Sequence, residues 1–288
     1  MKRKINWLSS LEERNKNLIN GLESKLQNFY STNQEYYNTI DFTSDSWIDK
    51  EELGFKDIVD VAKTAGEILE VGCGSANILK HYGYLQTRYH GCDFSGGLLS
   101  NNSIKFPCAS FRTLKKPNSL PYENNVFDLV FSVYVIEHTT NPSLFLNECI
   151  RVLKQNGILI ILCPDFLGQG RMTSQRAGFS AGTTTDKLKK KKYFDALITY
   201  YDNHVKIPFF CKYLSCKARN KPRFFINIAP TIFTDKFFPD VDAVYVTSRK
   251  EMILYLQKET TLIKNPPELK KYETRRKLIY LKLKKGIY

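Results

Sequence analysis

The stretch EILEVGCGSANIL at residues 67–79 decides the fold. It joins an apolar run of strand length, which contains Glu70 near its end, through Gly-Cys-Gly to a segment with helical character. Glycine has no Cβ, so Gly72 and Gly74 allow a sharp turn and a close approach of a ligand to the backbone. In an open parallel sheet, ligands bind beyond the carboxyl ends of the strands. We therefore predict a ligand-binding corner at residues 70–74.

The segments around this corner alternate between expected strands and expected helices. Strands are expected at residues 67–71, 88–94, 126–136 and 158–163, and helices at 54–65, 75–83 and 141–157. In the last helix, Asn141 suits the N-cap, Pro142 the first turn and Gly157 the end. Strands separated by helices of this length predict an α/β fold, in which helices cover both faces of a parallel sheet.

Two acidic residues indicate what the corner binds. A dinucleotide site would have a third glycine near position 77 to seat a pyrophosphate, but the chain has Asn77 there. Glu70 precedes the turn and suits a ligand with a cationic group. Asp93 ends the second expected strand, 23 residues after Glu70, where a carboxylate can accept both hydroxyls of a ribose. A nucleoside with a positively charged tail fits both acids, and S-adenosyl-L-methionine is such a molecule.

Four stretches carry a resemblance to a known family. EILEVGCGSANIL, YHGCDFSGGLL, LPYENNVFDLVFSVYVIEH and FLNECIRVLKQNGILIILCPD resemble, in order and spacing, the successive motifs of class I S-adenosylmethionine-dependent methyltransferases, type 11-like. The resemblance covers roughly residues 55–164 and, more weakly, 247–288. It implies a Rossmann-like, mostly parallel seven-stranded sheet with an antiparallel last strand. It also implies methyl transfer from S-adenosyl-L-methionine, with S-adenosyl-L-homocysteine as the product.

The resemblance implies a set of cofactor-binding residues. They are Glu70, Gly72, Cys73 and Gly74 at the methionine end, Asp93 at the ribose, Phe94 against the adenine, Ser132, Val133 and Tyr134 beneath the sulfonium, and Tyr37 in an N-terminal segment that closes over the cofactor in similar enzymes. One position departs from the family pattern. Lys116 stands where many relatives have an aspartate that binds the adenine amine, so backbone groups or Asn118 are expected to bind the adenine instead.

Three side chains are candidates for the catalytic base. Methyl transfer needs a base only when the acceptor is protonated at neutral pH. The candidates are His138 and Asp165, each just beyond an expected strand, and His204 farther along the chain. The structural alternatives are a loop-shaping histidine, a turn cap and a surface histidine. No metal is expected, because Cys211 and Cys216 lack a second pair that would complete a zinc site.

The strand-and-helix pattern breaks after residue 164 and resumes near the C-terminus. We expect an N-terminal helical or lid segment at residues 1–54, a cofactor-binding Rossmann-like core at 55–164, an inserted substrate cap at 165–246, and a closing helix and strands at 247–288. The cap is rich in Tyr, Phe and Lys, and it carries 14 basic and 7 acidic residues. Aromatic rings stack on sugars or bases, and lysines bind phosphates. The predicted reaction is therefore methyl transfer to O or N of an anionic small-molecule or glycan acceptor, including phosphate- or nucleotide-linked ones.

The charge distribution leaves other functions open. The net formal charge is +14, and residues 151–288 carry 28 basic and 11 acidic residues. An RNA methyltransferase would use this basic half to bind nucleic acid, but no RNA-binding module is recognisable. A non-catalytic S-adenosylmethionine-binding subunit is a second alternative. A third is an enzyme that acts on lipids at an anionic membrane; it is the weakest, because the KLKKKK run at residues 187–192 has no interleaved apolar face.

The composition also bears on location. No apolar stretch approaches the roughly 18–20 residues that span a bilayer, and no apolar signal core follows the basic start MKRKINWLSS. Seven cysteines without a regular framework suit a reducing compartment. The sequence therefore predicts a cytoplasmic protein without a transmembrane segment, and it leaves the oligomeric state open.

Overall fold

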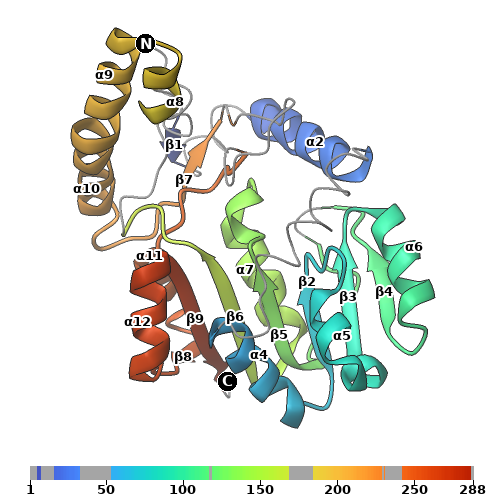
Figure 1. The fold of residues 1–288 in the computed structure, drawn as a ribbon. Coiled ribbons are helices and arrows are strands. Elements are labelled where there is room, and N and C mark those ends of the chain that lie inside the picture. The colour runs from blue at the N-terminus through green and yellow to red at the C-terminus, as the bar shows by residue number, and fades with distance from the viewer. Residues whose placement is uncertain are drawn as a thin grey trace.

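A seven-stranded sheet forms the centre of the fold. The structure is a computed structural model that describes residues 5–7, 16–32, 53–116, 119–168, 184–228, 230 and 242–286. The strands of the sheet are β2 (Ile68–Val71), β3 (Tyr89–Asp93), β4 (Ser110–Thr113), β5 (Phe127–Val133), β6 (Leu153–Pro164), β8 (Thr260–Leu262) and β9 (Leu278–Lys285). Their order is β4-β3-β2-β5-β6-β9-β8; β9 runs antiparallel to both β6 and β8, and the other pairings are parallel (Figure 1). This confirms the predicted α/β sheet with its antiparallel last strand.

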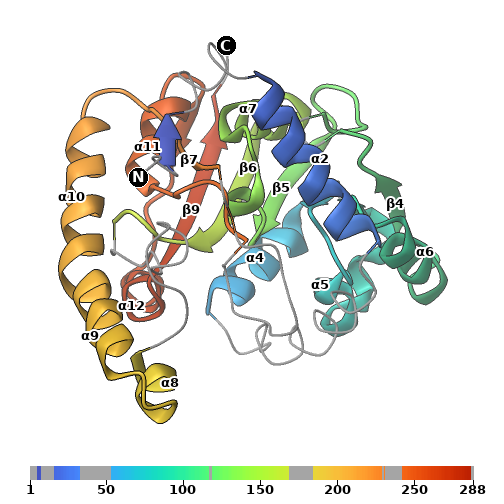
Figure 2. The ribbon, with the colours of Figure 1, turned by 90° about the horizontal axis from the view of Figure 1, so that it is seen from above.

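Helices cover both faces of the sheet (Figure 2). Apolar residues of α4 (Leu53–Thr64), α5 (Asn77–His81) and α12 (Pro267–Arg276) pack in one cluster, and those of α2 (Lys16–Thr32), α7 (Pro142–Val152) and α11 (Arg249–Leu256) pack in the other. The last strand contributes to both clusters: Leu278 and Tyr280 point to the first, and Ile279 and Leu281 to the second. A strand buried on both faces is continuously apolar, as residues 278–281 (LIYL) of β9 are, whereas lysines enter toward its end.

Helix α7 begins as predicted and ends earlier than predicted. The side chain of Asn141 caps it by accepting the N–H of Leu144 at 3.2 Å, and Pro142 is its first residue. It ends at Val152 rather than near Gly157, because Leu153 already pairs with Phe127 of β5 as the first residue of β6. The predicted helix end at Gly157 is therefore wrong.

The expected insertion contains regular structure that the sequence did not predict. Its helices are α8 (Thr184–Lys189), α9 (Tyr193–Tyr201) and α10 (Ile207–Lys217), with a π-helical turn at Asp202–Lys206 between the last two. Both views show these helices as an arm at one flank of the molecule, away from β4 and the helix α6 (Gly96–Lys105) at the other flank (Figures 1 and 2).

The N-terminal segment and the insertion meet in a short ribbon. Strand β1 (Ile5–Trp7) pairs antiparallel with β7 (Phe225–Asn227), and the ribbon lies above the carboxyl ends of the parallel strands (Figure 1). The ribbon is tied to the core through residues 244–245. The N–H of Asn227 in β7 donates to the carbonyl of Val244 at 2.7 Å, and the N–H groups of Val244 and Tyr245 both donate to the carbonyl of Glu137 just after β5. None of the helices in the described ranges is long and apolar enough to cross a bilayer.

Candidate functional site

Glycine is needed at the two positions of the corner for different structural reasons. Both adopt left-handed backbone conformations, with φ of 74° at Gly72 and 47° at Gly74. A Cβ on Gly72 would lie 2.9 Å from Cγ1 of Val135 and closer still to its Cγ2. A Cβ on Gly74 would meet no atom of the described residues within 4 Å. Gly72 is therefore required for packing, whereas Gly74 faces open space through which a ligand can reach the backbone.

Asp93, the last residue of β3, holds this corner. Its Oδ2 accepts the N–H of Gly74 at 3.0 Å, and its Oδ1 accepts the N–H of Ser95 at 3.0 Å. Burial raises the pKa of the Asp93 carboxyl, and the backbone N–H donors of Ser95, Gly74 and Phe94 oppose that shift. Each carboxylate oxygen has a second lone pair, so Asp93 can still accept the two hydroxyls of a ribose.

Glu70 is a buried acid next to the same corner. The hydroxyl of Tyr89 donates to its Oε2, and Gly91, the β3 residue that pairs with Glu70, has no side chain to separate them. Burial raises the pKa of Glu70 to about 8, and nearby Asp93 adds to that rise while the Tyr89 hydrogen bond opposes it. The site can therefore stabilise a cationic group, since a nearby positive charge favours the ionised carboxylate.

The end of β5 lies beside this corner in the sheet. Ser132 and Val133 are its last residues, and Tyr134 follows with a φ of 57° and donates its N–H to the carbonyl of Leu162 at 2.8 Å. The Oγ of Ser132 is buried and has no hydrogen-bond partner among the described residues. Phe94, directly after Asp93, is partly buried against the core. The buried Cys73 completes the turn, with its N–H donating to the carbonyl of Cys92 at 3.1 Å.

Sequence reasoning missed two side chains that support the corner. The amide Nδ2 of Asn102, buried in α6, donates to the carbonyl of Gly74 at 2.8 Å. Tyr89 holds Glu70 as described above. The strand alternation in β3 places Tyr89 and Asp93 on one face, which is a signal for Tyr89. Asn102 has no comparable signal, because it stands in the polar stretch SNNS.

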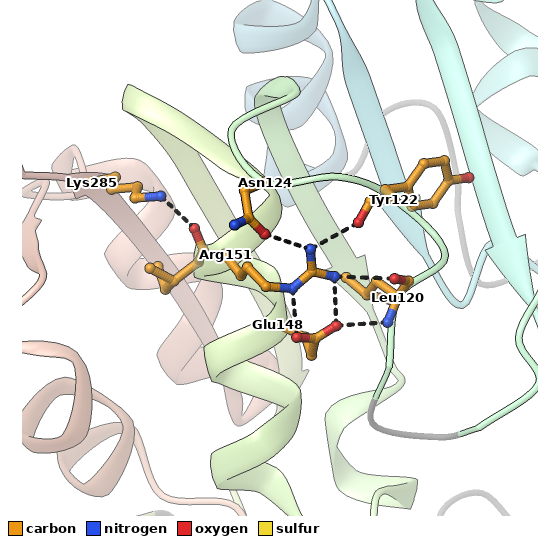
Figure 3. A network of polar contacts seen from close by, with 7 residues as sticks. Leu120, Tyr122, Asn124, Glu148, Arg151 and Lys285 are labelled. Carbon is orange, nitrogen blue, oxygen red and sulfur yellow. Dashed lines mark hydrogen bonds and ion pairs between the residues drawn. The ribbon is translucent and has the colours of Figure 1, made fainter.

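Arg151 of α7 fixes the loop that contains Leu120 (Figure 3). Its guanidinium donates to both carboxylate oxygens of Glu148 at 2.7 Å and to the carbonyls of Leu120 and Tyr122 at 3.1 and 2.8 Å. Glu148 in turn accepts the N–H of Leu120 at 2.8 Å. The loop on which the adenine contact was expected is thus attached to the core on its C-terminal side.

The other residues expected near this loop or over the cofactor are Lys116, Asn118 and Tyr37. Lys116 forms an isolated backbone bridge with Ser119. Asn118, between them, and Tyr37 both lie outside the described residues. Their expected contacts with the adenine and with the bound cofactor stay predictions.

His138 lies in a polar cluster formed by three distant segments. Its Nδ1 is 3.2 Å from the hydroxyl of Tyr30 in α2 and 3.3 Å from Oδ2 of Asp242, and the Tyr30 hydroxyl also donates to that carboxylate. Its Nε2 is 3.9 Å from Oε1 of Glu137, which is buried. An imidazole held at Nδ1 by a carboxylate can take up a proton and have the resulting charge stabilised. Tyr30 and Asp242 were not predicted, because no sequence spacing connects them with His138.

The other two base candidates lie elsewhere. Asp165 follows β6 and is buried, its Oδ1 accepts the N–H of Gly168 at 2.8 Å, and burial raises its pKa to about 6. It lines a pocket of about 440 Å³ with residues of α10 and α11. His204 is exposed in the π-helical turn of the arm, and its ring contacts that of Tyr200 at 4.3 Å between centroids. The structure brings neither residue into the His138 cluster.

Potential metal ligands are dispersed in the part of the chain that the structure describes. There, no three His, Cys, Asp or Glu side chains form a group that could hold a metal ion.

Comparisons with known proteins add independent information. The family model for a methyltransferase domain matches residues 69–161. A probable S-adenosylmethionine-dependent methyltransferase of Mycolicibacterium smegmatis is 25% identical over 120 residues, which is 41% of this chain and 46% of that protein. The ubiquinone/menaquinone biosynthesis C-methyltransferase of Desulfotalea psychrophila is 30% identical over 101 residues, which is 34% of this chain and 41% of that protein. The chain thus spans less than half the length of these two relatives.

One solved structure shares the fold over most of the chain. It comes from Listeria monocytogenes and was solved as a candidate S-adenosylmethionine-dependent methyltransferase. The TM-score is 0.51 at 13% sequence identity, and the match covers 81% of this chain and 98% of that one. At this identity the likeness establishes the fold alone.

Proposed function

We propose that residues 69–161, which match the family model of a methyltransferase domain, form a class I S-adenosylmethionine-dependent methyltransferase core, and that the protein transfers a methyl group to O or N of a small-molecule or glycan-type acceptor. The observation that carries the proposal is the hydrogen bond from the N–H of Gly74 to Asp93, which joins the glycine turn to an acid suited to a ribose. The buried Glu70, next to the same turn, suits the cationic end of the cofactor.

The proposed roles follow the order of the strands across the sheet. Glu70 binds the ammonium of the methionine moiety, and the backbone of residues 72–74 lies along it. Asp93 accepts the ribose hydroxyls, and Phe94 packs on the adenine. The end of β5 at residues 132–134 passes beneath the sulfonium. When bound, S-adenosylmethionine supplies an electrophilic methyl group, so the protein has mainly to align the acceptor and exclude water.

His138 is the proposed base for acceptors that must lose a proton. In the proposed tautomer Nδ1 carries the proton, 3.3 Å from Oδ2 of Asp242, and Nε2 is the basic nitrogen of the ring. Tyr30 orients the same carboxylate through its hydroxyl. Proton uptake at Nε2 would create a positive charge that Asp242 stabilises, as in other His-carboxylate pairs. Asp165 and His204 are the weaker candidates, because Asp165 lines a separate pocket and His204 lies on the exposed arm.

In this proposal, the segments beyond the carboxyl ends of the strands determine which acceptor binds. We assign residues 1–54 to a lid and 165–246 to a cap, around the core at 55–164 and its closing elements at 247–288. The β1–β7 pairing and the Tyr30–Asp242 hydrogen bond support this assignment, because each joins the N-terminal segment to the insertion. The aromatic and basic composition of the cap favours an anionic acceptor.

The test supplies methyl-labelled S-adenosylmethionine to the purified protein together with separate extract fractions of small metabolites, glycans, lipids and RNA. Label is expected in the small-metabolite or glycan fraction, and it should disappear with Asp93→Ala. The surface variant Asp60→Ala, at an exposed position of α4 outside the lid and the cap, is the matched control and should keep the activity. Label in RNA or lipid alone would contradict the proposed acceptor. Binding of the cofactor without label in any fraction would favour a non-catalytic subunit.

A further inference from the structure

The arm formed by residues 184–217 exposes large apolar side chains on its outer face. Its inner face is buried through residues at helical spacing, namely Ala196, Thr199, Ile207, Cys211 and Leu214. On the opposite side of α9, Tyr193, Leu197 and Tyr201 recur every four residues. Phe194 and Phe209 are 75% and 74% exposed. The arm therefore has an apolar side toward the protein and a second apolar side toward solvent.

This exposure is concentrated rather than scattered. Among the described residues, sixteen large hydrophobic side chains are exposed, and ten of them lie on the arm. Single exposed apolar residues are ordinary on protein surfaces, whereas contiguous ones mark a surface that binds another molecule or a membrane. The arm accordingly has the character of a docking surface.

Positive charge lies directly beside the apolar face. Lys189, Lys190, Lys191 and Lys192 are all exposed at the turn between α8 and α9. Further along, Lys206 lies 5.5 Å from the ring centre of Tyr201, and Lys217 lies 5.7 Å from that of Tyr213. Residues 184–219 contain nine lysines and arginines and three aspartates. The basic run at residues 187–192 has no interleaved apolar face of its own, and α9, which follows it, supplies one.

We propose that this arm docks the protein on an anionic lipid bilayer, with the aromatic face of α9 and α10 at the headgroup level and the lysines against lipid phosphates. Helices with Lys on one side and Phe, Tyr and Leu on another bind in the plane of such interfaces, and their affinity rises with anionic lipid. A spanning helix is not needed for this mode. A second copy of the chain fits less well, because a symmetric contact would place two lysine clusters together, and lysine is depleted in protein interfaces.

The experiment measures co-sedimentation of the full-length protein with vesicles of phosphatidylcholine alone and with vesicles that also contain phosphatidylglycerol. Binding is expected only to the anionic vesicles and should weaken at high salt. Lys189→Gln/Lys190→Gln should lower the partition coefficient about fivefold for each lysine removed. Phe194→Ser/Phe209→Ser should lower it by roughly tenfold or more. Because these side chains are exposed, the variants should have the same midpoint of urea unfolding as the wild type.

Matched controls separate the arm from general surface effects. Lys270→Gln/Lys271→Gln removes the same charge from exposed positions on α12. Ile104→Ser makes the same kind of change at a position on α6 that is 80% exposed. Both controls should bind vesicles as the wild type does. The proposal would be overturned if the arm and control variants had equal effects or if the protein did not bind vesicles. It would also be overturned if the protein, without binding vesicles, formed a dimer or an RNA complex that Phe194→Ser/Phe209→Ser disrupted. Vesicle binding does not depend on methyl transfer, so this test and that of the proposed function can fail separately.

Discussion

The carboxylate of Asp93 accepts the backbone N–H of Gly74 at 3.0 Å, although the two residues belong to different strand ends and lie 19 positions apart in the chain. This hydrogen bond connects the turn after β2 to the end of β3, and the amide of Asn102 fixes the same turn through its carbonyl. The turn is thus held in place by side chains of β3 and α6 before any ligand binds. A preorganised site of this kind loses less free energy to ordering when its ligand arrives.

Alanine at the two glycines should have different effects. Gly72→Ala should lower the free energy of unfolding by about 2–4 kcal/mol, since it adds strain at positive φ to a clash with Val135. Gly74→Ala should cost only about 1 kcal/mol but weaken binding of S-adenosylmethionine, because its methyl group would project into the open corner. Urea denaturation and calorimetric titration measure the two effects. Gly96→Ala, where a Cβ also meets no described atom within 4 Å, is the control. Equal destabilisation by both alanines would contradict this account.

Binding of S-adenosylmethionine should release a proton from Glu70 at neutral pH. Its pKa of about 8 leaves the carboxyl mostly protonated at pH 7 in the free protein, and a bound cation favours the carboxylate. The affinity should therefore rise between about pH 6 and 8, by at most about tenfold per pH unit. Titration calorimetry in two buffers with different ionisation enthalpies measures the released proton, and Glu70→Gln should release none. Identical apparent enthalpies in both buffers would exclude this role for Glu70.

The same residue should make the stability of the free protein depend on pH. An unfolded chain ionises its glutamates near pH 4.3, whereas folded Glu70 ionises only near pH 8. Between these values the folded state binds more protons, so the free energy of unfolding should fall as the pH rises. Relative to Glu70→Gln, the wild type should lose stability from about pH 5 to pH 8. Parallel curves for the two proteins in urea denaturation would contradict the high pKa.

Asp242 should set the tautomer and the efficiency of His138. Asp242→Asn should change the ring ¹⁵N shifts of His138, which can be assigned because the chain has only four histidines. It should also lower kcat on the order of a hundredfold without altering affinity for S-adenosylmethionine. His138→Gln should lower kcat at least as far, and Tyr30→Phe less. Asp60→Asn, at an exposed position of α4, is the control. An unchanged tautomer together with an unchanged kcat would remove His138 from the reaction.

Arg151 should stabilise both the fold and the loop at Leu120. Arg151→Ala removes the partner of Glu148 and leaves the carbonyls of Leu120 and Tyr122 without their donor (Figure 3). The expected loss is about 2 kcal/mol in urea denaturation, with faster hydrogen exchange in the loop. Arg275→Ala, at an exposed position near the end of α12, should cost little. If the two variants were equally stable, the network would be structurally unimportant.

The sequence predicted β2, β3, β5 and β6 because these strands are apolar runs of strand length. It did not predict β4, since SFRT is short and partly exposed. It did not predict α12, since PELKKYETRR turns only Leu269, Tyr272 and Glu273 inward and has little apolar periodicity. It did not predict α6, because that helix starts with two glycines and continues through SNNS. Local pattern therefore found the elements that bury a continuous face and missed those that bury a few side chains.

Long-range contacts set a second limit on prediction. Glu70 and Asp93 could be read from the sequence because each stands at a strand end, where the topology fixes its place. The contacts of His138 with Tyr30 and Asp242 join positions 108 and 104 residues apart, and no local pattern specifies them. The sequence also did not predict the outward apolar face of α9. Both the buried and the exposed side of this helix carry apolar residues, so no polar stripe distinguishes them.

Calorimetric titration of S-adenosylmethionine into the wild type and into Asp93→Ala tests the central claim most directly. The wild type should bind one equivalent, and Asp93→Ala should bind roughly a hundredfold more weakly, because it loses the charged acceptor of the two ribose hydroxyls and of the Gly74 N–H. Asp195→Ala should bind as the wild type does. Equal affinity of the wild type and Asp93→Ala, or no binding by a folded wild-type protein, would contradict the account.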